Sequence, residues 1–84
     1  MGLAPAPSAT AATRRHLSSR QARTVEALTG AAVEELGEAG YHGLTVRNVA
    51  KRAGVAPATA YTYFSSKEHL VAEVFWRRFQ DQAV

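Results

Sequence analysis

The sequence contains no cysteine, and only three of its 84 residues are proline. The absence of thiols excludes a disulfide framework and any thiolate metal site. Pro5 and Pro7 lie near the start, so the rest of the chain has few residues that interrupt a helix. No apolar run is long enough to cross a bilayer, and the first residues lack the basic start and apolar stretch of a signal peptide. We therefore expect a cytoplasmic protein without membrane contact.

The length leaves room for one small domain. Hydrophobic residues make up 46% of the chain and charged residues 20%, which is typical of a globular protein rather than a disordered one. A domain of this size buries a modest core and has little room for a large catalytic cleft. No nucleophile with a base and no glycine-rich phosphate loop can be assembled, so we expect no enzyme and no cofactor.

Charge is divided into blocks along the chain, which has a net charge of +3. Residues 1–23 and 44–67 contain arginine or lysine and no acid, whereas residues 24–43 contain four glutamates and neither lysine nor arginine. A polyanion would meet the two basic blocks and avoid the acidic one. Such blocks are also often no more than solvated faces, so charge alone does not decide between the two interpretations.

Apolar periodicity predicts an all-α fold. Residues 1–18 read as a flexible basic tail, because prolines break helix there and little can be buried. A first helix is expected over residues 19–39, with Ser18 and Gln21 as a capping box and Gly40 as an αL cap. Its inward face is the set of apolar residues spaced by three and four, which are Val25, Leu28, Ala32, Leu36 and Ala39.

Two short helices follow around a glycine turn. Thr45 is a good N-cap for a helix over residues 46–53, with Leu44 and Val49 as a hydrophobic staple. Gly54 ends that helix, and Pro57 can start a third helix over residues 57–64. A helix, a short turn containing glycine and a second helix form the helix-turn-helix pattern.

A fourth helix is predicted from a capping box at residues 65–68 to the end of the chain. Its apolar positions recur at helical spacing and are Leu70, Val71, Val74, Phe75 and Phe79. His16, His42 and His69 lie far apart, and only His69 and Glu73 form an i, i+4 pair. Two ligands do not make a zinc site, so we predict no metal.

Residues 44–70, LTVRNVAKRAGVAPATAYTYFSSKEHL, resemble the DNA-binding domain of the tetracycline-repressor (TetR/AcrR) family of bacterial transcriptional regulators. The resemblance extends over about residues 20–80. It implies a homeodomain-like three-helix bundle with a helix-turn-helix, followed by the start of a fourth helix. Helix 57–64 would be the recognition helix in the major groove.

The resemblance also implies which residues meet DNA. Thr45, Val46 and Arg47 would start a helix whose N-terminus lies against the backbone, where free N–H groups favour phosphate. Recognition-helix positions that would face the bases are Pro57, Ala58, Thr59 and Thr62. Tyr63 and Lys67 would contact phosphate, and Tyr61 would face inward or reach a phosphate.

Considered from their side chains alone, these residues have different expected roles. Tyr61 is expected in the core, whereas Tyr63 is expected on phosphate because it lies off the inward stripe of Tyr61 and Phe64. Lys51 and Arg52 are expected to be solvated. The recognition face lacks Arg, Asn and Gln, so base contacts are sparse and Arg47 is the best base-reading residue.

What the resemblance implies for the whole protein is a homodimeric transcriptional repressor on a palindromic operator, associated with the nucleoid when bound. The C-terminal domain that would dimerise and bind a small-molecule effector is expected to be absent from this chain. About four phosphate-neutralising side chains would give a log–log salt slope near −3.6. The alternative is a helical protein-interaction module that uses the amphipathic last helix.

Overall fold

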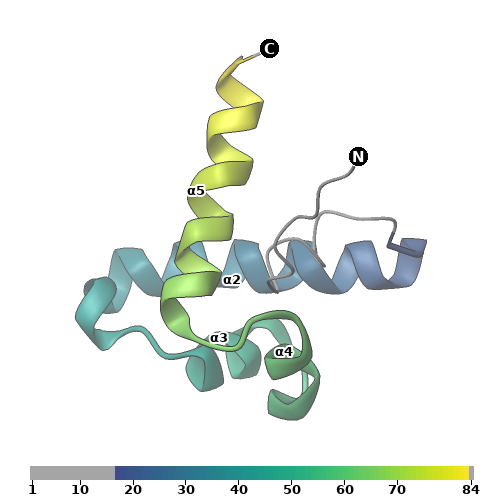
Figure 1. Cartoon of the computed structure of the whole chain (residues 1–84). Coiled ribbons are helices and arrows are strands. Elements are labelled where there is room, and N and C mark those ends of the chain that lie inside the picture. Colours follow the sequence, from purple (N-terminus) through teal and green to yellow (C-terminus); the bar gives the residue numbers. More distant parts are fainter. Residues whose placement is uncertain (1–16, 84) are drawn as a thin grey trace, which may run out of the picture.

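The computed structural model describes residues 17–83, with side chains described as far as residue 80, and this part consists of helices α2 to α5. They are α2 (Ser19–Gly43), α3 (Val46–Ala53), α4 (Pro57–Tyr63) and α5 (Lys67–Ala83). In Figure 1, α2 lies across the domain, α3 and α4 lie on one side of it, and α5 crosses it and projects away. α2 packs against α3 and α5, and α3 packs against α4. The predicted all-α fold is confirmed.

α2 begins as the sequence predicts and ends differently. The Ser18 hydroxyl accepts a hydrogen bond from the Gln21 amide at 3.1 Å, and the Gln21 side chain accepts one from the Ser18 amide at 2.9 Å. Gly40 has φ 73° and ψ 173°, a conformation open almost only to glycine, but this is not the αL cap that we expected. One further helical turn follows, because the Leu44 amide donates to the carbonyl groups of Gly40 and Tyr41.

The helix-turn-helix forms as predicted. The Thr45 hydroxyl accepts from the Asn48 amide at 3.0 Å and caps α3, and Gly54 ends α3 in the αL region with φ 73° and ψ 29°. α4 starts at Pro57 after Ala56, which makes no side-chain cap hydrogen bond. The cap of α5 differs from the prediction: Ser66, one residue later than expected, accepts from the amide of His69 at 3.2 Å.

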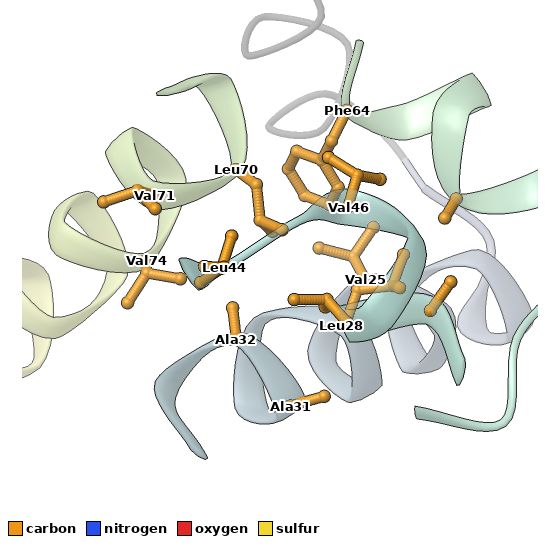
Figure 2. Packing of buried hydrophobic residues seen from close by; sticks show 13 residues of the cluster. Val25, Leu28, Ala31, Ala32, Leu44, Val46, Phe64, Leu70, Val71 and Val74 are labelled. Atoms are coloured by element: carbon orange, nitrogen blue, oxygen red, sulfur yellow. The ribbon is translucent and has the colours of Figure 1, made fainter. Parts of the chain in front are cut away.

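A single hydrophobic core joins all four helices. Phe64 is its largest fully buried side chain, and Figure 2 shows Phe64, Leu70 and Val46 pointing toward one another from different elements. Leu17 packs against this core, while residues 1–16 of the predicted tail lie outside the described residues. The predicted inward face of α2 is too long, because Ala39 is exposed beside the break at Gly40.

The last helix leaves the core halfway along its length. Leu70, Val71 and Val74 are buried, but Phe75 and Phe79 are 62% and 66% exposed, because at about 100° per residue they lie on the side of α5 away from the buried face. The prediction that all five residues form one inward stripe is therefore wrong for Phe75 and Phe79. None of the described helices is long and apolar enough to span a membrane.

Candidate nucleic-acid interface

α3 presents a polar face on a short and firmly anchored helix. Leu44 and Val49 are fully buried on either side of the Thr45 cap, which holds the start of α3 on the core. Val46 is only 4% exposed, so its side chain belongs to the core and only its backbone N–H could reach a phosphate. The Arg47 side chain is exposed. The N-terminus of α3 therefore offers first-turn N–H groups and one guanidinium to an anion.

An open groove of about 430 Å³ runs between α3 and the start of α4. It is lined by polar side chains of α3 and by small residues of the turn, and these are Arg47, Asn48, Lys51, Gly54, Val55 and Pro57. Two cations and one amide thus share a wall of the groove. The sequence interpretation left out Asn48 and treated Lys51 as solvated. The spacing could have revealed them, because residues three and four apart lie on one helical face.

The recognition helix exposes small side chains. Ala58, Thr59 and Thr62 are exposed, Pro57 is half-buried, and Ala60 faces the core. The Thr62 hydroxyl donates to the carbonyl of Ala58 at 3.1 Å, which leaves its methyl group available for an apolar contact. A helix with such short side chains can approach the floor of a major groove closely.

The two tyrosines of α4 differ in burial, and one of them does not lie where we expected it. Tyr61 is 47% exposed, so the prediction that it lies in the core is wrong. Tyr63 is partly buried and packs against the core. The inward stripe is formed by Ala60 and the C-cap residue Phe64, and at about 100° per residue Tyr61 and Tyr63 lie equally far from it on either side, so spacing alone does not decide which tyrosine packs against the core.

Lys67 links the start of α5 to the end of α2. Its ammonium group donates to the carbonyl oxygens of Tyr41 at 2.9 Å and His42 at 3.4 Å, and it lies 4.4 Å from the centre of the Tyr41 ring. An ammonium group has three N–H donors, so one remains for a phosphate. These intramolecular contacts were missed because their partners lie 25 and 26 residues away.

Glu68 strengthens the same junction. A backbone amide hydrogen bond, followed by hydrogen bonds from Ser66 and Tyr41, lowers the pKa of the Glu68 carboxyl. Partial burial, followed by the neighbouring Glu68 charge, raises the pKa of the Tyr41 phenol. The last turn of α2 and the first turn of α5 are thus joined by side chains from both helices.

Arg52 is an exposed residue, as expected, but it is also held by the acidic block of α2. Its Nε and Nη2 atoms both lie 3.0 Å from Oε2 of Glu35. Nη2 donates to Glu38, and Nη1 lies 3.5 Å from Glu34. The hydrogen bonds to Glu38 and Glu35 raise the pKa of the guanidinium above its ordinary value. Three of the four glutamates that form the acidic block therefore face a cation of the basic block.

The histidines in the described part of the chain form no metal site. Nδ1 of His69 lies 3.3 Å from the Ser65 hydroxyl, and its ring meets Phe64 edge-on. Glu73, the expected neighbour of His69, is fully buried and accepts from Nε of Arg77 at 3.0 Å. Among the side chains of residues 17–80, no group of three histidines or carboxylates is placed to hold a metal ion.

Comparison with known proteins supports the helix-turn-helix interpretation. The family described as bacterial regulatory proteins, tetR family, matches residues 28–74. An uncharacterised HTH-type transcriptional regulator of Mycobacterium tuberculosis is 61% identical over 56 residues, which cover 67% of this chain and 26% of that protein. The fatty acid metabolism regulator protein of Bacillus subtilis is 49% identical over 45 residues, or 54% of this chain and 23% of that protein.

A third relative is named as a repressor. The HTH-type transcriptional repressor KstR of Mycolicibacterium smegmatis is 46% identical over 41 residues, covering 49% of this chain and 20% of that protein. The chain thus spans about a quarter of the length of the curated relatives it matches. No solved structure gives a significant match. The family match covers more than half of the chain and includes the whole helix-turn-helix. The chain therefore belongs to the TetR family of bacterial regulatory proteins, and its helix-turn-helix is the DNA-binding domain of such a transcriptional regulator.

Proposed function

We propose that this domain reads double-stranded DNA sequence-specifically by placing α4 in the major groove. The observation that carries the proposal is the groove beside the start of α4, whose wall presents Arg47, Asn48 and Lys51. Cations beside a helix of short exposed side chains suit a surface that grips the phosphate backbone and lets the helix approach the bases.

Each element has a role in this proposal. Thr45 and the first N–H groups of α3 meet one phosphate, and the Arg47 guanidinium meets a second phosphate where it reaches from α3 toward a base edge. Lys51 and Asn48 bind the backbone beside it. Pro57, Ala58, Thr59 and Thr62 pack against base edges, including thymine methyl groups, since short side chains make few bidentate hydrogen bonds. Sequence preference then depends strongly on the shape of the DNA.

The aromatic residues have different roles. Tyr61 is nearly half exposed and extends from the recognition helix toward the backbone, where its hydroxyl can donate to a phosphate. Tyr63 is partly buried against the core, and its hydroxyl donates to a second phosphate. Lys67 gives its third N–H to a phosphate while it holds the end of α2.

For the whole regulator we propose a homodimer that represses transcription. Two heads on a two-fold axis read half-sites about one helical turn apart, so the operator is palindromic. A small effector bound to a further domain changes the spacing of the heads and releases the DNA. The regulator acts by binding rather than by catalysis, and it works on the bacterial chromosome.

The exposed aromatic side chains of α5 favour a second candidate. Phe75, Trp76 and Phe79 are 62%, 40% and 66% exposed and lie in the second half of α5. We propose that they pack against the dimerisation domain of the whole regulator. If binding a protein partner through this surface is the main function of the chain, the domain is instead a protein-interaction module.

Selection from random duplexes separates the two functions. The chain is mixed with a random duplex pool at moderate salt, and the bound fraction is sequenced. Enrichment of a half-site or palindrome supports DNA reading, and Arg47→Glu should abolish the enrichment while the helical circular dichroism signal is kept. Phe79→Asp is the matched control, and it should leave enrichment intact. No DNA binding by the wild-type chain would favour the interaction module instead.

A further inference from the structure

The position of the recognition helix depends on α3. Ala60 is the one fully buried side chain among the seven residues of α4, and Ala56 gives that helix no side-chain cap. The helix that α4 packs against is α3. A change in the angle of α3 on α2 would therefore move the whole DNA-reading surface.

α3 is itself held by two kinds of contact. Apolar side chains at Val46, Val49 and Ala50 bury its inner face, which resists separation from α2 but restrains sliding weakly. The directional contacts come from Arg52, in the last turn of α3, whose three guanidinium nitrogens all reach glutamates of α2. Arg52 lies two residues before Gly54, where the turn into α4 begins.

The arrangement also directs the Arg52 guanidinium to α2. The Arg52 side chain is 28% exposed; that of Glu35, whose Oε2 meets two nitrogens of Arg52, is 12% exposed, while those of Glu34 and of the bidentate partner Glu38 are 64% and 69% exposed. A guanidinium has five donors in a rigid plane, so three carboxylates along one helix fix its orientation better than a single ion pair would. The groove that holds Arg47 and Lys51 does not include Arg52.

We propose that Arg52 is a positioning residue for DNA binding: clamped by Glu34, Glu35 and Glu38, it fixes α3 on α2 and makes no phosphate contact. The proposal rests on the proposed function. It separates two neighbouring basic residues by role, with Lys51 on the backbone of DNA and Arg52 on the glutamates of α2. Positional coupling of this kind is ordinarily visible as non-additive binding energies.

The test measures affinity and salt slope by fluorescence anisotropy, with the 84-residue chain and a fluorescein-labelled random-sequence duplex. All variants are compared at a temperature at which each gives the full helical signal. Arg52→Gln should weaken binding about tenfold and keep the wild-type salt slope. The affinity of Arg52→Lys should lie between those of the wild type and Arg52→Gln. Lys51→Gln should reduce the magnitude of the slope by about 0.9. A slope reduction of that size in Arg52→Gln, or wild-type affinity, would overturn the proposal.

Removing a glutamate of the cluster changes the DNA affinity in opposite directions, depending on whether Arg52 positions α3 or is merely kept from binding DNA. Glu38→Ala loosens the clamp, and Glu26→Ala is the matched control because it removes the same charge from an exposed position on α2 outside the cluster. If Arg52 positions α3, Glu38→Ala should bind about threefold more weakly than Glu26→Ala. If the glutamates merely withhold Arg52 from DNA, Glu38→Ala should bind more tightly and with a steeper slope, which contradicts the proposal. A wild-type chain that shows no salt-dependent binding would refute the proposed function itself.

Discussion

The salt dependence of DNA binding gives the most direct quantitative test of the interface. Each phosphate neutralised by a side chain contributes about −0.9 to the slope of log affinity against log salt concentration. Sequence reasoning with four contacts predicts about −3.6. The structure ties Arg52 to three glutamates and leaves Arg47, Lys51 and Lys67 available to phosphate. We therefore expect a slope near −2.7 for one head.

The two values are readily distinguished. With three contacts, raising the salt from 50 to 200 mM weakens binding about fortyfold, whereas four contacts give about 150-fold. The assay is a fluorescence anisotropy titration at several salt concentrations. The duplex is short enough to bind one copy of the domain, and the stoichiometry is measured in parallel. Arg47→Gln should reduce the magnitude of the slope by about 0.9, and Phe79→Ala should leave it unchanged.

Two outcomes would refute this reasoning. A slope near zero would show that phosphates are not bound by these cations, and the electrostatic part of the proposed function would fail. A wild-type slope of about −3.6 or steeper would mean that a further cation reaches the backbone. In that case Arg52→Gln identifies the source, because it restores a slope near −2.7 only if Arg52 leaves its cluster on DNA.

Four further predictions concern single residues. Tyr63→Phe should cost about 1 kcal/mol of affinity on every duplex, measured by titration, and a change in sequence preference would contradict its assignment to phosphate. Gly54→Ala should lower the free energy of unfolding by about 1 kcal/mol, because the φ of Gly54 is 73°. Gly30→Ala, in the exposed interior of α2, should raise that free energy by up to about 1 kcal/mol, and urea titrations measure both changes. Ala56→Ser should raise the melting temperature, since a cap hydrogen bond contributes about 1 kcal/mol. The lowered pKa of Glu68 stabilises the fold above the ordinary glutamate value, so that contribution should vanish as the pH falls through the lowered pKa, and Glu68→Gln should flatten this part of the urea-stability profile.

Local signals predicted the helix-turn-helix well. The cap at Thr45, the buried pair Leu44 and Val49 and the αL glycine at Gly54 all depend on residues within a few positions of one another. Such features are dictated by backbone geometry and short-range hydrogen bonds, which a sequence displays directly. The recognition helix was placed within one residue of its observed end for the same reason.

The orientation of the tyrosines could not be read in this way. α4 has only seven residues, so its apolar pattern covers two turns and fixes the inward direction poorly. Phe64 was identified correctly as core, but Tyr61 was chosen as its companion in place of Ala60. A small side chain in the core carries little weight in a hydrophobicity pattern, although it decides which neighbours face solvent.

Long-range polar contacts were missed for a different reason. Arg52 meets glutamates 14 to 18 positions away, and Lys67 meets carbonyl groups 25 and 26 positions away. Periodicity shows that a charged residue lies off the apolar stripe, but it cannot show which other helix borders that face. The block of glutamates on α2 was visible as charge, and its partner was not.

The distinction between Arg52 and Lys51 shows why this matters for function. Both residues belong to one basic block and lie side by side in sequence, so net charge treats them as equal contributors to DNA binding. In the fold, one borders the groove beside the recognition helix and the other turns to the glutamates of α2. Because consecutive residues on a helix point about 100° apart, a basic block on a short helix necessarily divides between its faces. Those residues that bind DNA are selected by what the neighbouring helix places opposite the others, and here α2 places three carboxylates opposite Arg52.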